Sequence, residues 1–291
     1  MIGKAWLLIK ETASGFLADE ALTRGAAIAY YTIFSIAPLL IIVIAIAGLA
    51  FGRDAAEGAV VGQLSGLMGE QSATVLQSMI TSANNWGAGL LATIIGLVTL
   101  LLTATGTFAE IQSALNAIWK AAPSANLSAI VRARLLSLGL VVTLGFLMLV
   151  SLVVSAALAA LGSYLDYLVP GGQILIAVAN FVLSLTIISA LFAAIYKILP
   201  DKPIAWRDVG VGAVATALLF VFGKSLIGFY IGSSGVASSY GAAGALLIIL
   251  LWVYYSAQVF LLGAEFTKAY AATHGSQASE GKIAATGRRL R

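Results

Sequence analysis

Residues 225–264 read SLIGFYIGSSGVASSYGAAGALLIILLWVYYSAQVFLLGA, forty consecutive residues without one charged side chain. An α-helix needs about 20 apolar residues to cross the hydrocarbon core of a bilayer, so this run is long enough for parts of two spans. Glycine and serine at 232–235 favour a short turn between them. The stretch therefore predicts two membrane-spanning helices, at roughly 208–231 and 242–265.

Similar uncharged runs elsewhere in the chain predict four more spans. They are expected at roughly 25–51, 87–108, 135–161 and 173–198. The composition agrees, because 60% of the 291 residues are hydrophobic and only 10% are charged. Soluble domains carry about 25% charged residues. The chain is too apolar to cover a water-facing surface, and we expect an all-α polytopic membrane protein with six transmembrane helices.

Lysine and arginine lie almost entirely on one side of these expected spans. Fourteen of the sixteen occur in the N-terminal segment, the second and fourth connections and the C-terminal tail, whereas the opposite side holds Arg53 alone. Positively charged residues favour the cytoplasmic side of a membrane. The sequence therefore predicts cytoplasmic N- and C-termini. This topology explains the formal net charge of +4, and no nucleic-acid partner is required.

The domain organisation follows from these spans. Residues 1–24 form an amphipathic cytoplasmic segment, of the kind that lies in a membrane interface, and residues 25–270 form the transmembrane domain. Within that domain, residues 53–86 carry apolar side chains at mostly helical spacing. They predict one or two helices on or within the outer leaflet, or a loop helix packed on the bundle. Residues 271–291 are expected to be a basic, disordered tail.

Lys224 is the one cation expected deep inside a span. It lies about 16 residues into the helix predicted at 208–231, roughly 24 Å from its cytoplasmic start. An ionisable residue within a span costs about 2.5–3.5 kcal/mol or more, and it usually faces the bundle interior or a wet cavity. Two readings remain open: an anion-binding role, or a lysine that extends to the headgroups or pairs structurally. Gly223 and Gly228 would let a helix or a ligand approach closely.

Tyr31, Ser35 and Pro38 fall on one face of the first expected span. Pro38 cannot donate a backbone hydrogen bond, which leaves the carbonyl of Phe34 without its usual donor. Within lipid such a group is tolerated only where protein or water satisfies it. We therefore expect this face to point inward and the helix to kink, with packing or substrate contact as its role.

A set of polar residues is expected at the cytoplasmic edge of the bundle, because the predicted topology brings the relevant helix ends to that side. Its members are Arg24, Glu110, Gln112, Asn116, Arg132, Arg134 and Glu265. Gln112 and Asn116 share a helix face at spacing i, i+4. Ion pairing that closes the cytoplasmic face is one reading, and a gate or proton-coupled role is the other.

The residue types that metal and thiol chemistry need are nearly absent. The chain has no cysteine, which excludes disulfides, thiolate metal sites and cysteine nucleophiles. Its one histidine, His274, lies in the polar tail. Gly223-Lys224-Ser225 lacks the upstream glycine of a nucleotide-binding loop and lies within an expected span. We therefore expect no catalytic residues, no metal and no cofactor.

Five motifs occur in a fixed order along the chain. They are AIAYYTIFSIAPLL at 27–40, EIQSALNAIW at 110–119, Gly223-Lys224 with Tyr230, SYGA at 239–242, and LWVY at 251–254 leading to LGAE at 262–265. In these motifs, over roughly 20–270, the chain closely resembles the YihY/BrkB family of bacterial inner-membrane proteins. The resemblance implies a location in the bacterial inner membrane, and it adds Tyr230 to Lys224, Tyr31, Ser35 and Pro38 as candidate ligand or lipid contacts.

The resemblance implies a role in the bacterial envelope. With Lys224 inside a span, the leading expectation is a transporter or flippase-like protein for a lipid or another amphiphilic anion. The alternative is a non-transporting scaffold that holds envelope protein partners. Members of the family were formerly labelled as a transfer-RNA ribonuclease, but metal-dependent hydrolysis needs clustered ligands that one histidine and scattered carboxylates do not offer. Membrane lipids are the expected partners, and the oligomeric state stays open.

Overall fold

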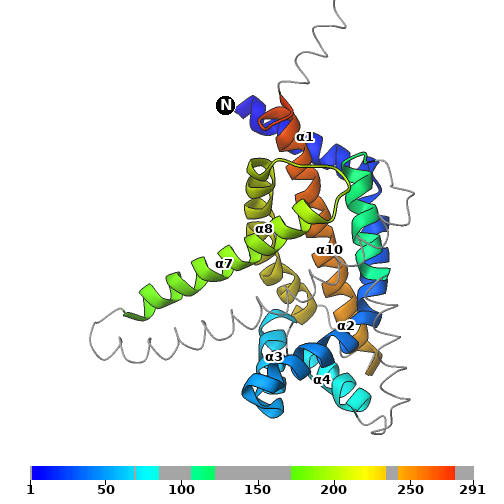
Figure 1. The fold of residues 1–291 in the computed structure, drawn as a ribbon, viewed down its shortest axis with the longest axis vertical. Helices are drawn as coiled ribbons and strands as arrows, with labels where there is room; N and C mark the ends of the chain where they lie inside the picture. The colour runs from blue at the N-terminus through cyan, green and yellow to red at the C-terminus, as the bar shows by residue number, and fades with distance from the viewer. Residues whose placement is uncertain (1, 69, 85–105, 122–171, 234–241, 279–291) are drawn as a thin grey trace, which may run out of the picture. The chain divides into compact units, whose positions relative to one another are not determined.

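The structure of the chain is a computed structural model that describes residues 2–68, 70–84, 106–121, 172–233 and 242–278. These residues are helical apart from short connections, and no strand occurs among them. The labelled helices are α1 (Ile2–Ala18), α2 (Ala21–Phe51), α3 (Arg53–Met68), α4 (Glu70–Asn84), α7 (Gly172–Ile198), α8 (Trp206–Ser233) and α10 (Ala242–Thr273) (Figure 1). A further helix occupies 106–118. The all-α class is confirmed for the described part of the chain.

Three of the described helices are long and apolar enough to cross a membrane. The corresponding segments are Ala177–Ile198, Trp206–Ile231 and Leu246–Thr273. They coincide with the spans predicted at 173–198, 208–231 and 242–265. The last helix continues to Thr273, beyond its predicted end, because alanine-rich residues that favour a helix follow the apolar run. The span predicted at 135–161, and most of that predicted at 87–108, lie outside the described residues.

The N-terminal segment contains a helix break that the sequence did not predict. α1 ends at Ala18 and α2 begins at Ala21, so the region assigned to one amphipathic segment holds the start of a second helix. Glu20 has a left-handed backbone with φ 55°, a conformation that ends a helix. α2 is 31 residues long and stays helical through Pro38. The kink expected at Pro38 stays a prediction.

The segment predicted to hold one or two helices, at 53–86, contains the two helices α3 and α4. Gly52, with φ 84°, turns the chain from α2 into α3, and the three helices contact one another (Figure 1). Ala56 and Val60 of α3 are buried at spacing i, i+4, as one face of a packed helix requires. Two packed helices therefore occupy this region. Their place on or within the outer leaflet stays a prediction.

The chain divides into two compact units, each described by itself. One contains the described residues 2–13, 121, 172–219 and 263–278, and the other contains 14–68, 70–84, 106–120, 220–233 and 242–262. α8 and α10 run through both units, and named contacts join the two helices in each.

In the first of these units, α8 and α10 interlock through two matching Gly-x-x-x-Thr motifs. A Cβ on Gly212 would overlap the hydroxyl of Thr267, and a Cβ on Gly263 would overlap that of Thr216. Each threonine hydroxyl donates to the carbonyl of its own helix's glycine at 2.7 Å, so neither is left unsatisfied. Tyr196 of α7 adds a third hydroxyl, 3.2 Å from that of Thr216. Small residues thus allow a close approach of two apolar helices.

Candidate functional site

Lys224 lies on the side of α8 opposite its most exposed apolar residues. Phe222, Leu226 and Phe229 are 70%, 72% and 79% exposed, and their spacing places them on one face. With 3.6 residues per turn, Lys224 falls on the other side of the helix, one turn from the buried Ile227. Lys224 itself is half-buried. This placement favours an inward-facing lysine over one that extends along a lipid-exposed face.

The described contacts of this part of α8 are with uncharged groups. The backbone of Gly223 lies against the hydroxyl of Tyr255 on α10, where any side chain at position 223 would clash. One turn earlier, Phe220 packs edge-on against Trp252 with ring centroids 6.1 Å apart. One turn later, a Cβ on Gly228 would meet nothing within 4 Å. Lys224 therefore lies between a close helix contact and open space.

Tyr31 and Ser35 both contact the helix at 106–118. The Tyr31 ring lies where a Cβ on Gly106 would fall, and the buried Ser35 hydroxyl is 3.3 Å from that of Thr107. These two members of the predicted face are therefore used in helix packing, and the structure does not describe the side chain of Pro38. Tyr230 is 54% exposed and lies one turn after the exposed Leu226 on α8.

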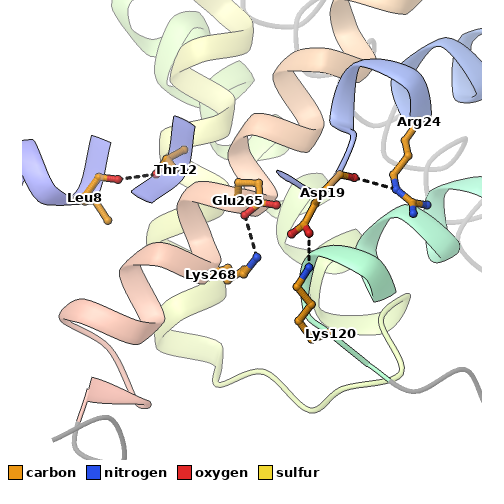
Figure 2. Close-up of polar contacts among 7 residues, drawn as sticks. All are labelled: Leu8, Thr12, Asp19, Arg24, Lys120, Glu265 and Lys268. Atoms are coloured by element: carbon orange, nitrogen blue, oxygen red, sulfur yellow. Dashed lines mark hydrogen bonds and ion pairs between the residues drawn. The ribbon is translucent and has the colours of Figure 1, made fainter. Parts of the chain in front are cut away.

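A buried carboxylate that the sequence analysis did not single out joins the α1–α2 junction to the end of the helix at 106–118. The Asp19 carboxylate forms an ion pair with the ammonium of Lys120, which donates a hydrogen bond to it (Figure 2). Arg24 donates a hydrogen bond from its Nε to the Asp19 backbone carbonyl at 3.0 Å. The Asp19 side chain is 4% exposed and that of Lys120 is 66% exposed. Lys120 and Glu20 are the non-glycine residues with positive φ among the described residues. The two adjacent acidic residues at 19–20, within an otherwise helical pattern, are the sequence feature that could have indicated this break.

The predicted cytoplasmic set is divided between the two units and residues outside the described part, so its assembly stays a prediction. Glu110, Gln112 and Asn116 are half-buried on the helix at 106–118, in the same unit as Arg24. Glu265 belongs to the other unit, where its buried carboxylate pairs with Lys268 at 3.2 Å on the same helix (Figure 2). Arg132 and Arg134 lie outside the described residues.

Asp208 is a second buried carboxylate that the sequence did not reveal. It lies in the first turn of α8, where a negative charge is favourable. It accepts hydrogen bonds from the backbone nitrogen of Ser276 at 3.1 Å and from the Ser276 hydroxyl at 2.6 Å. This contact ties the start of α8 to the turn that follows α10. Lys197 nearby donates to the Ile204 carbonyl and lies 5.4 Å from the Trp206 ring.

The described residues contain no group of three or more histidine, cysteine, aspartate or glutamate side chains able to hold a metal ion. The three buried carboxylates among these residues, Asp19, Asp208 and Glu265, instead make contacts between and within helices. Apolar helices of membrane-spanning length with small-residue seams define the class of an all-helical integral membrane protein.

Within that class, the chain belongs to the virulence factor BrkB family, whose model matches residues 12–287. A UPF0761 membrane protein of Rhodospirillum centenum is 28% identical over 89% of this chain and 56% of its own length. The putative ribonuclease-like protein YfkH of Bacillus subtilis is 27% identical over 88% of this chain and 92% of its own. A UPF0761 membrane protein of Ralstonia nicotianae is 32% identical over 58% of this chain and 37% of its own. No solved structure matches the chain. The family resemblance found in the sequence is confirmed.

Proposed function

We propose that this protein is a transporter or flippase-like protein for a lipid or another amphiphilic anion in the bacterial inner membrane. The observation that carries the proposal is the position of Lys224 within a candidate span, on the side of α8 opposite its exposed apolar face. An ammonium held there can attract an anionic headgroup, while the acyl chains remain in lipid. Tyr31, Ser35, Pro38 and Tyr230 are the further residues proposed to contact lipid or substrate.

The topology that we propose has six spans with both termini in the cytoplasm. Its support is the excess of lysine and arginine on one side, together with the agreement between the predicted spans and the candidate spans in α7, α8 and α10. We place the predicted cytoplasmic set, including Glu110 and Arg24, at the cytoplasmic ends of the helices. The basic tail at 271–291 lies on the same side in this scheme.

We also propose that the protein is not an enzyme and needs no cofactor. A hydrolase that acts through metal ions needs several clustered ligands. The sequence has no cysteine and one histidine, and the buried carboxylates of Asp19, Asp208 and Glu265 are engaged in the contacts given above. The ribonuclease-like name of the Bacillus relative is therefore not carried over to this chain.

The alternative is a membrane scaffold for envelope protein partners. The observation in its favour is the exposed apolar stripe on α1, where Trp6, Ile9 and Leu17 are 67%, 60% and 69% exposed. A partner helix could pack on this stripe, as could the membrane interface. A scaffold would not move lipid by itself, which separates the two candidates.

Lipid movement in proteoliposomes tests the proposal. A fluorescent phospholipid is placed in both leaflets, and a membrane-impermeant reductant quenches the outer one. Wild-type protein should allow quenching beyond half of the label, Lys224→Met should slow it at least about tenfold, and Lys224→Arg should restore much of the rate, since charge is what the site supplies. Leu226→Met, on the exposed face of the same helix, is the matched control and should behave as wild type.

Each alternative result has a definite meaning. If Lys224→Met moves lipid at the wild-type rate, Lys224 is not the site. If wild-type vesicles behave as empty ones with each lipid tested, the transport proposal fails and the scaffold stands.

A further inference from the structure

We infer that the site at Lys224 selects ligands by charge number: it accepts amphiphiles with one negative charge, such as phosphodiester headgroups, and rejects dianionic phosphomonoesters. This inference rests on the proposed function, and it names the substrate class of the same site. It follows from the number of cations that the spans supply and from the surroundings of the one that is available.

The first step is the count of cations within the spans. Besides Lys224, the only lysine or arginine in any of the six predicted spans is Lys197, at the end of 173–198. Lys197 occupies the last turn of α7, where its ammonium donates to the Ile204 carbonyl and lies over the Trp206 ring. Lys224 is therefore the one cation in the predicted spans that is left for a ligand.

The second step is that Lys224 has no carboxylate partner among the described residues. Among the residues that the structure describes, no carboxylate forms an ion pair with it and no group accepts a hydrogen bond from it. By contrast, Lys120 and Lys268 are each paired with a carboxylate. A ligand with one negative charge would leave the site neutral.

The third step is the cost of any charge that remains. The described contacts of α8 on either side of Lys224 are made by uncharged residues, since Gly223 lies against Tyr255 and Phe220 lies against Trp252. In such surroundings the interaction between charges is strong and an unpaired charge is expensive. A dianion would keep one uncompensated charge in this environment, so binding and passage of the dianion should be strongly disfavoured.

The fourth step is that the site has room to be changed. Gly228 lies one turn after Lys224 on the same side of α8, and a Cβ there would meet nothing within 4 Å. A lysine at position 228 would place a second ammonium beside the first. The resulting Gly228→Lys variant should then accept the dianion, while Gly228→Met adds similar length without charge and should not.

The test uses proteoliposomes of phosphatidylcholine with acyl-chain-labelled phosphatidylglycerol, a diester, or phosphatidic acid, a monoester. A phosphate monoester loses its second proton with a pKa of about 6. At about pH 8, wild-type protein should therefore move phosphatidylglycerol at least about tenfold faster than phosphatidic acid. At about pH 5, phosphatidic acid is a monoanion and its rate should approach that of phosphatidylglycerol. Protein-free vesicles at each pH supply the spontaneous rates to be subtracted.

The outcomes separate the inference from the function on which it rests. Equal movement of both lipids at about pH 8 would overturn charge selection and leave lipid transport standing. Movement of neither lipid would refute the transport proposal itself. Gly228→Lys should raise the rate of phosphatidic acid at about pH 8 relative to Gly228→Met, and a gain of the same size in both variants would show that space and not charge sets the selection.

Discussion

Replacing Lys120 with methionine should destabilise the second compact unit by about 2 kcal/mol. The Asp19 carboxylate is 4% exposed, so the loss of the Lys120 ammonium removes compensation from a nearly buried charge. Breaking a fully buried ion pair costs about 3–5 kcal/mol. Lys120 is 66% exposed, and pairs that face solvent contribute at most about 1 kcal/mol. The mixed geometry places the expected loss between these limits.

The backbone at Lys120 supplies an independent check on the same position. Its φ of 50° is left-handed, which costs a non-glycine residue about 1 kcal/mol. Lys120→Gly loses the ion pair but relieves this strain, so it should be about 1 kcal/mol more stable than Lys120→Met. In the double variant Asp19→Asn with Lys120→Met, the buried carboxylate is removed together with the Lys120 ammonium, and much of the loss should be recovered.

Unfolding in mixed micelles, with rising proportions of a denaturing detergent, measures these differences. Tryptophan emission is a suitable signal because Trp119, next to Lys120, is buried. Lys120→Met with wild-type stability would refute the assignment of the ion pair. A glycine variant less stable than the methionine variant would refute the argument from backbone strain.

Three further predictions use the same unfolding measurement. Gly212→Ala and Gly263→Ala should each lower the free energy of unfolding by about 1–3 kcal/mol, because the new methyl overlaps a threonine on the facing helix. In the control Gly210→Ala the methyl meets nothing, so this variant should be neutral or stabilising. Equal effects at all three positions would contradict the interlocked packing. Asp208→Ala should lower the free energy of unfolding by about 1–3 kcal/mol, because Ser276 loses its acceptor. Ser276→Ala should cost less, because the backbone nitrogen at position 276 still donates to the Asp208 carboxylate. The reverse order would contradict this contact. Glu20→Gly should raise the free energy of unfolding by about 1 kcal/mol, because glycine adopts the left-handed backbone at position 20 without strain. A loss of stability would show that the Glu20 side chain makes a stabilising contact.

The long apolar helices could be predicted from the sequence because their signal is local. An apolar stretch long enough to span a bilayer specifies a helix wherever it occurs, as in α7, α8 and α10, and Lys224 within α8 does not obscure it. The break at Asp19 and Glu20 could not, since it is stabilised by Lys120, 101 residues along the chain. Pairing at such a distance leaves no periodic trace in the sequence.

The candidate site was only partly predictable for a related reason. Composition identifies Lys224 as anomalous, but the exposed stripe of Phe222, Leu226 and Phe229 is needed to decide which side of the helix it occupies. The interlocked helices were not predicted because a contact between glycine on one helix and threonine on another leaves no pattern within either helix. Here glycine on each helix receives threonine from the other, at Gly212 with Thr267 and at Gly263 with Thr216.

The same reciprocal contact limits how α8 and α10 can move. If one helix slid along the other, each threonine side chain would leave the space beside its glycine and clash with the adjoining turn of the facing helix. Packed surfaces of this kind have discrete positions and do not deform continuously. A shift would therefore have to advance by a whole turn, about 5.4 Å, or not occur at all. Around Gly212 and Gly263 we therefore expect α8 and α10 to move together as one rigid body in any rearrangement.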